Sequence, residues 1–147
     1  MHTITPIPVR TSERVFRSNA PTPRSYARSE KDLRQLREHL RRPEIAGLPW
    51  VAHILRHKIR MAKPDNASGF DDAVTGTSYT IWSVDDGPPE TGLLSHRARY
   101  GNATGVIPVC SSLGAALIGM SVGDRTPYLR ADLTICLLKI LRTTTLA

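Results

Sequence analysis

Residues 106–124 read Val-Ile-Pro-Val-Cys-Ser-Ser-Leu-Gly-Ala-Ala-Leu-Ile-Gly-Met-Ser-Val-Gly-Asp, and they combine the signals of a strand, a short helix and a turn. The β-branched residues at the start favour a short buried strand. Ser111 or Ser112 can cap the helix that follows, because a serine oxygen accepts from a free N–H of the first turn. Apolar residues then recur at helical spacing: Leu113, Ala116 and Leu117. Gly119 is predicted to end the helix, since glycine adopts the left-handed conformation without a Cβ clash.

This stretch resembles the C-terminal domain signature of the GreA/GreB transcription elongation factors. In that family a Ser-Pro-Leu-Gly-like start leads into Ala-Leu-Leu-Gly and then Val-Gly-Asp. Here residues 111–119 read Ser-Ser-Leu-Gly-Ala-Ala-Leu-Ile-Gly, residues 122–124 read Val-Gly-Asp, and Ser112 replaces the usual proline. The resemblance covers residues 74–130 well and residues 29–63 loosely. It is closer to the short-coil relatives known as regulators of nucleoside diphosphate kinase.

The chain is predicted to have three parts. Residues 1–28 contain four prolines among Thr, Ser and Arg and little apolar surface, so we expect a flexible basic arm. Residues 29–63 are predicted to form an antiparallel helical hairpin around the link Pro43–Gly47. Residues 70–143 are predicted to form the C-terminal domain, a small antiparallel sheet with one helix, which the family resemblance implies to be FKBP-like. The fold class is therefore α+β.

Hydrophobic spacing defines the elements within these parts. The apolar stripe of the first helix consists of Leu33, Leu36 and Leu40, and that of the second of Val51, Leu55, Ile59 and Ala62. The predicted strands span residues 74–84, 91–99, 106–109, 124–130 and 133–141.

The positive charge is concentrated in the first half of the chain. Residues 1–63 carry 14 Lys/Arg and five Asp/Glu, whereas residues 64–147 carry six and eight, within a net charge of +7. A basic half on a nearly neutral body indicates an acidic partner, either nucleic acid or an acidic protein surface. The candidates for phosphate contacts in the arm are Arg10, Arg14, Arg17, Arg24 and Arg28. The alternative is a solvated tail without a dedicated partner.

Several other functions find little support in the sequence. Cys110 and Cys136 lie in apolar segments and are expected to be reduced and buried. There is no apolar run of about 18 residues and no continuous apolar core of a signal peptide, so we expect a cytoplasmic protein. His53 and His57 have the i,i+4 spacing of a metal-binding pair, but no third ligand is near in sequence, so we expect solvated or partner-facing histidines. No metal or other cofactor is expected.

The link between the two helices bears on catalysis. In the cleavage-competent Gre factors, two acidic residues at the tip of a long coiled coil help to hold the second Mg²⁺ of RNA polymerase. Here the link reads Pro-Glu-Ile-Ala-Gly, and Glu44 is its one carboxylate. A hard cation needs several oxygen ligands, so the presence of one carboxylate in place of two argues against transcript cleavage. The resemblance therefore implies a non-catalytic regulator with a short hairpin.

By the same resemblance, the C-terminal domain is expected to bind bacterial RNA polymerase at the rim of the secondary channel and to regulate elongation. The expected contact residues are Val109, Ser111, Ser112 and Leu113, although a place in the core is the alternative for Leu113. Backbone N–H groups at a helix N-terminus can bind an acidic side chain of a partner. The second hypothesis is a nucleic-acid-binding accessory protein that acts through the basic half. An enzyme, either a cleavage stimulator or an isomerase, is the third and least supported.

Overall fold

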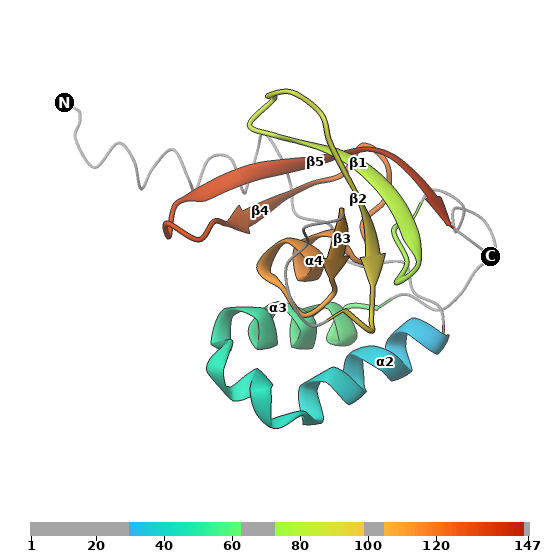
Figure 1. Cartoon of the computed structure of the whole chain (residues 1–147), viewed down its shortest axis with the longest axis vertical. Coiled ribbons are helices and arrows are strands. Elements are labelled where there is room, and N and C mark those ends of the chain that lie inside the picture. Colours follow the sequence, from blue (N-terminus) through green and yellow to red (C-terminus); the bar gives the residue numbers. More distant parts are fainter. Residues whose placement is uncertain (1–29, 63–72, 99–104, 146–147) are drawn as a thin grey trace.

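The computed structural model describes residues 30–62, 73–98 and 105–145, and it confirms a mixed α+β fold. The described elements are α2 (Glu30–Arg41), the 3-10 helix η2 (Pro43–Gly47), α3 (Pro49–Arg60), β1 (Ser78–Val84), β2 (Glu90–Ser95), β3 (Val106–Pro108), α4 (Ser112–Leu117), β4 (Arg125–Leu129) and β5 (Ile135–Thr145). Figure 1 shows a curled sheet with α4 beneath it and with α3 and α2 below α4. The predicted arm, residues 1–28, lies outside the described part of the chain. None of the described helices is both long and apolar enough to span a membrane.

The five strands form one sheet in the order β3-β2-β1-β5-β4. The pairs β1–β2, β1–β5 and β4–β5 are antiparallel, as predicted. The pair β2–β3 is parallel, so the prediction of a purely antiparallel sheet is wrong at this edge. Two hydrogen bonds hold β3 beside β2 in this direction: Leu93 N–H donates to Gly105 O at 2.8 Å and Val109 N–H donates to Ser95 O at 3.0 Å. This pairing brings the start of α4 to one end of the sheet.

Strand β1 begins at Ser78, four residues later than the alternating pattern from residue 74 predicts. The earlier residues pair with the segment after α4 instead. Val74 N–H donates to Met120 O and Val74 O accepts from Gly119 N–H, both at 2.8 Å. Gly119 has φ +83, which fits the prediction that glycine ends this helix. The chain entering β1 therefore fixes the C-terminal end of α4.

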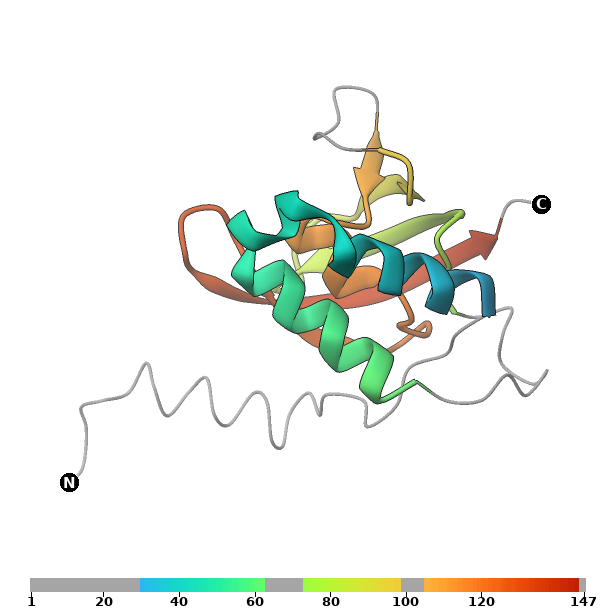
Figure 2. The same ribbon diagram turned by 90° about the horizontal axis from the view of Figure 1, so that it is seen from below.

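One hydrophobic core connects the helices to the sheet. Its buried members from all layers include Leu36 of α2, Val51 and Leu55 of α3, Leu117 of α4, and Trp82, Leu138 and Ile140 of the sheet. Leu33 of α2 is also buried, at 7% exposed. Four residues of the two predicted apolar stripes are therefore buried: Leu33, Leu36, Val51 and Leu55. Figure 2 shows α2 and α3 lying across one face of the sheet.

A buried lysine joins α3 to α4. Lys58 is 4% exposed, and its Nζ donates to Ala116 O at 2.6 Å and to Ile118 O. These carbonyls lie at the C-terminal end of α4, where no intrahelical N–H remains to satisfy them. Burial lowers the pKa of Lys58 well below its usual value, and the charge of Asp124 opposes this shift in part. A neutral amine still has the two N–H groups that the two carbonyls require.

A second polar connection joins α2 to the sheet. His96, which follows β2, contacts Asp32 Oδ1 through Nε2 at 2.8 Å and His39 Nε2 through Nδ1 at 2.9 Å. The Asp32 carboxylate also accepts from Gly76 N–H, at 3.1 and 3.2 Å to its two oxygens. A Cβ on Gly76 would lie 2.1 Å from the His96 ring, so only glycine fits there. These contacts set the position of α2 relative to the β1–β2 end of the sheet.

Candidate protein-docking surface

The chain turns from β3 into α4 at residues 109–112. Ser111 is the N-cap: its Oγ accepts from Gly114 N–H at 3.0 Å and donates to Pro108 O at 2.7 Å. Of the two serines predicted as possible caps, Ser111 is therefore the one that caps α4. Its hydroxyl already satisfies one of the N–H groups that an acidic partner was expected to use. Helix α4 also spans only six residues, so its end offers little to an anion.

The four expected contact residues differ in exposure. Val109 has no exposed surface, so it lies beneath this region and does not reach a partner directly. Ser112 is half-buried, and its Oγ donates to Leu129 O at 2.5 Å, which ties α4 to the end of β4. Leu113 is half-buried and packs against the hydrophobic core, as the alternative for this residue proposed.

A groove of about 620 Å³ lies beside these residues, and we call it the docking groove. Ser111, Ser112 and Leu113 line it together with residues from two distant parts of the chain. One side comes from the start of α3, with Leu48, Pro49 and Trp50, and the other from the β4–β5 connection, with Leu129, Arg130 and Leu133. A Cβ on Gly114 would lie 1.9 Å from Pro108 O, so α4 is held tightly against β3 next to the groove.

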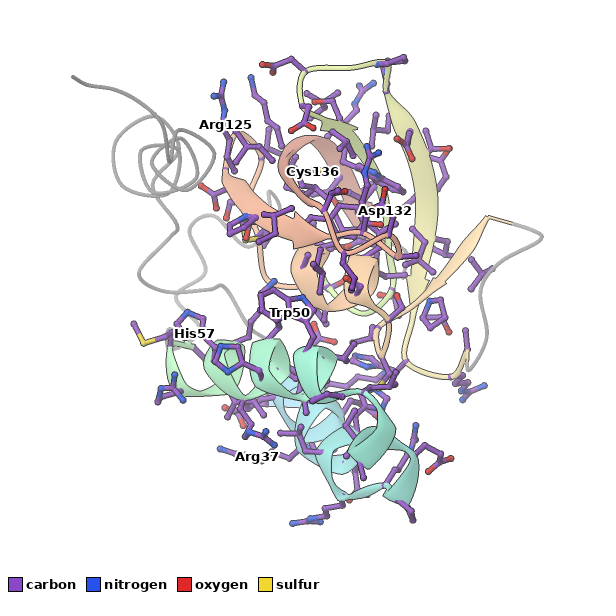
Figure 3. The ribbon with its side chains drawn as sticks, turned by 90° about the vertical axis from the view of Figure 1, so that its left-hand side faces the viewer. Arg37, Trp50, His57, Arg125, Asp132 and Cys136 are labelled. Carbon is purple, nitrogen blue, oxygen red and sulfur yellow. The ribbon has the colours of Figure 1, made fainter. Side chains whose placement is uncertain are left out.

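Large apolar side chains stand exposed on both sides of the docking groove. Leu48 is 40% exposed, Trp50 36% and Leu133 78%. Leu133 also has a positive φ of 70°, a conformation that costs a residue with a Cβ atom free energy. Figure 3 shows Trp50 on the side of the helices that faces the sheet, whereas Arg37 projects from the opposite side. Exposed apolar residues gathered around one groove are typical of a protein-interaction surface.

The residues expected to contact a partner did not include Trp50, Leu48 or Leu133. A signal for Trp50 was present, because it does not belong to the apolar stripe that begins at Val51 and yet is a large aromatic residue. Its ring lies 6.0 Å from that of His53, which is exposed on the next turn of α3. Leu133 had no such signal, since it was predicted to begin the final strand, residues 133–141, where a leucine is common; the strand begins at Ile135 instead.

The polar groups of the docking groove are few. Among the described residues that line it, Arg130 carries the one formal charge. Burial raises the pKa of the Tyr128 hydroxyl; the nearby Arg130 acts against this shift, while Glu90 and Cys136 reinforce it. Tyr128 is thus protonated at neutral pH and can donate a hydrogen bond. An apolar partner surface with a carboxylate or carbonyl near Arg130 would complement this groove.

Glu44 lies outside the docking groove. It is exposed on η2 and lines a neighbouring hollow of about 310 Å³ together with His39, Arg42 and Cys110. Within residues 30–62, 73–98 and 105–145, no group of three or more His, Cys, Asp or Glu side chains is placed to hold a metal ion. The pKa of His57 on α3 is lowered by burial and by the nearby Arg60, His53 and Lys58.

The arm arginines Arg10, Arg14, Arg17, Arg24 and Arg28 lie outside the described residues. The described helices carry a basic surface of their own, made by the exposed side chains of Lys31, Arg34, Arg37, Arg41, Arg56 and Arg60. One exposed ion pair interrupts it, between Arg41 and Glu38 at 3.1 Å.

Comparison with known proteins shows what this arrangement resembles. No protein-family model matches the sequence, and no curated protein matches it. Among solved structures, a prokaryotic transcription elongation factor GreA/GreB from Nitrosomonas europaea superposes with a TM-score of 0.59 at 18% identity, over 82% of this chain and 98% of that one. The chain has a GreA/GreB-type fold. Two further structures superpose less well: Gfh1 of Thermus aquaticus, with a TM-score of 0.43 at 15% identity over 83% of this chain and 99% of that one, and GreA factor homolog 1 (Gfh1) of Thermus thermophilus, with a TM-score of 0.40 at 17% identity over 92% and 88%.

The GreA/GreB-type fold extends beyond the stretch that suggested it. The superposition covers nearly all of the Nitrosomonas protein, whereas the sequence resemblance was good only for residues 74–130. The docking groove lies where β3, α4 and the start of α3 come together. The N-terminal helices and the sheet with α4 therefore both contribute to it.

Proposed function

We propose that this protein binds bacterial RNA polymerase through the docking groove and regulates transcription elongation without catalysing a reaction. The observation that carries the proposal is the groove itself. Ser111, Ser112 and Leu113 of the signature stretch line it, and the exposed side chains of Trp50 and Leu133 stand on its two sides. The fold shared with a transcription elongation factor supports a partner that takes part in transcription. The proposed site on the polymerase is the rim of the secondary channel.

The energetics of protein interfaces favour such a surface. Exposed Trp and Leu side chains bury large apolar areas when a partner covers them, and Trp is among the residues that dominate measured binding energies. The docking groove adds a hydrogen-bond donor, Tyr128, and a cation, Arg130. A helical partner element with apolar residues and a carboxylate would fit this combination.

The link between the helices supports a non-catalytic role. Stimulation of transcript cleavage requires carboxylates that cluster around Mg²⁺. Glu44 is the one carboxylate of Pro43–Gly47, and its described neighbours include the cation Arg42. We propose that the protein acts as a short-hairpin member of this class, similar to the regulators of nucleoside diphosphate kinase. Stalled elongation complexes incubated with the protein should release no cleaved transcript, and enhanced cleavage would refute this part of the proposal.

Retention of core RNA polymerase by the immobilised full-length protein tests the binding step. The full chain is required, because Leu36, Val51 and Leu55 share a core with the sheet and a C-terminal fragment would lose that cover. Ser111 is a poor site for a disruptive variant, since its hydroxyl caps α4. Arg130→Glu reverses the charge in the groove and is expected to reduce retention, whereas Arg142→Glu, an exposed position on β5 outside it, serves as the matched control.

A second candidate function is binding of nucleic acid through the basic half of the chain. The exposed cations of α2 and α3 favour it, and the arm arginines add to the same charge. Phosphate contacts release counterions, so affinity for bare DNA or RNA should fall steeply with salt. Replacing Arg34, Arg37 and Arg41 by Gln should flatten this salt dependence. Binding that does not depend on salt would contradict this candidate.

A further inference from the structure

A further hollow, of about 510 Å³, adjoins the docking groove and shares four lining residues with it. Its buried lining consists of Trp82 and Val84 of β1. The residues shared with the docking groove are the half-exposed Leu113 and Tyr128 and the exposed Arg130 and Ala131. The volume lies within the range of about 300–1,000 Å³ in which small molecules bind.

Trp82 supplies the observation that points to a ligand. Its side chain is 2% exposed, and its Nε1–H is buried without a hydrogen-bond acceptor among the described residues. Native proteins satisfy nearly all buried donors, since an unsatisfied one loses its hydration without compensation. An indole nitrogen can only donate, so the missing group is an acceptor such as a carbonyl oxygen.

The remaining residues narrow the class of ligand. The exposed edge of the hollow carries Glu90, Arg130 and Asp132, which are charges of both signs. Asp132 lies on the β4–β5 connection (Figure 3). The two carboxylates and one guanidinium are exposed to solvent and partly offset one another, and the buried lining is apolar, so a charged ligand would lose its hydration there for little gain. Tyr128, which is half-buried, can provide one more hydrogen bond through its hydroxyl.

We propose that this hollow binds a small uncharged ligand, apolar over most of its surface, whose carbonyl oxygen accepts a hydrogen bond from Trp82 Nε1–H. The indole nitrogen is buried in the free protein, so binding requires a movement of side chains that line the hollow. The carbonyl belongs either to a free small molecule or to a residue of a polypeptide, since both present the same chemistry.

Nuclear magnetic resonance of the indole N–H groups tests this site without any polymerase, so its outcome is independent of the proposed function. The chain contains two tryptophans, and Trp50→Phe identifies the Trp82 signal. The ¹⁵N-labelled protein is titrated with cyclohexanone, as a free apolar ketone, and with N-acetyl-leucine methylamide, as a peptide-like carbonyl. N-acetyl-glycine methylamide is the matched control, because it keeps the carbonyls and lacks the apolar side chain.

We expect a saturable downfield shift of the Trp82 indole proton with at least one apolar probe, and a much weaker response to the glycine control. Saturation with cyclohexanone identifies a site for free small molecules, and saturation with the leucine derivative alone identifies a site for a polypeptide. Trp82→Phe should weaken the binding of the active probe by about 2–10-fold, measured from backbone amide shifts at Ala131. A Trp82 signal that moves with neither apolar probe, or that moves no more than the Trp50 signal, overturns the proposal.

Discussion

Lys58 on α3 donates a hydrogen bond from Nζ to the main-chain oxygen of Ala116 on α4, across 2.6 Å and 58 residues of sequence. The same nitrogen also contacts Ile118 O, so one side chain satisfies two carbonyls at the end of α4. This connection holds the C-terminal end of α4 against α3. Trp50 at the start of α3 and Ser111 to Leu113 at the start of α4 line the docking groove, so it depends on the same packing of α3 against α4.

Replacing Lys58 by methionine is expected to lower the free energy of unfolding by about 1–3 kcal/mol. Methionine keeps the apolar part of the side chain, but it leaves Ala116 O and Ile118 O without their donor. Urea denaturation at neutral pH measures the loss. Lys31→Met on the exposed face of α2 is the matched control and should change the stability by no more than about 0.5 kcal/mol. Equal stabilities of the two variants would contradict the role assigned to Lys58.

The lowered pKa of Lys58 also predicts a pH dependence. The shift is caused first by burial, so the folded state disfavours the charged amine. Between the lowered folded value and the unfolded value of about 10.4, the unfolded chain binds the additional proton. The free energy of unfolding therefore rises with pH in that window and falls as the pH drops toward the folded value.

The wild-type protein should consequently gain stability relative to Lys58→Met between about pH 8 and about pH 10. The comparison with the variant removes the contributions of other titrating groups, such as Tyr128. Denaturation curves of both proteins at the two pH values provide the measurement. A difference that stays constant or shrinks as the pH rises would show that Lys58 is charged in the folded protein at neutral pH.

The contact between Asp32 and His96 predicts a second loss of stability. Asp32→Asn weakens the contact with His96. It also leaves one carbonyl oxygen to accept from Gly76 N–H, in place of two carboxylate oxygens. We expect a reduction of about 1–3 kcal/mol in the free energy of unfolding, because these groups are buried. Glu38→Gln, which breaks only the exposed pair with Arg41, should cost about 0–1 kcal/mol. If the two substitutions have the same effect, α2 is not held by Asp32.

Leu133 is expected to show opposite effects on stability and binding. Its φ of 70° and its exposed side chain both disfavour leucine at this position. Leu133→Gly should therefore raise the free energy of unfolding by about 1 kcal/mol, since glycine adopts this conformation without a steric penalty. The same variant should bind core RNA polymerase more weakly, because it removes an apolar contact from the docking groove. Thermal unfolding and the polymerase dissociation constant are the two measurements, and unchanged affinity would remove Leu133 from the proposed surface.

Local sequence patterns predicted the parts of this fold that depend on neighbouring residues. The Ser111 cap, the apolar face of α4 and the role of Gly119 are set by contacts within a few residues, and the structure confirms them. Strand β1 was predicted four residues too early. The residues just before β1 alternate in polarity like a strand, but Val74 forms its hydrogen bonds with Gly119 and Met120, after α4. The alternation does not show which segment will supply the hydrogen-bond partners.

The docking groove could not be predicted because its sides are distant in sequence. Trp50 and Leu133 are separated by 83 positions. The packing of α3 against α4 places Trp50 near Ser112, and the contact of Ser112 with the end of β4 places the β4–β5 connection there. Lys58 illustrates the same limit, since a lysine among the exposed cations of α3 carries no local sign that it is buried. The parallel pairing of β2 with β3 is likewise a consequence of the chain path and not of either strand's composition.

The dissociation constant for bacterial core RNA polymerase, measured for the wild type and for two single variants, tests the central claim most directly. Trp50→Ala removes the aromatic side chain of the docking groove, and Tyr79→Ala removes an aromatic side chain that is 44% exposed on β1, outside it. We predict that Trp50→Ala weakens binding by about 10-fold or more, whereas Tyr79→Ala changes it by less than about 2-fold. Equal affinities for all three proteins, or no binding by the wild type, would contradict the account.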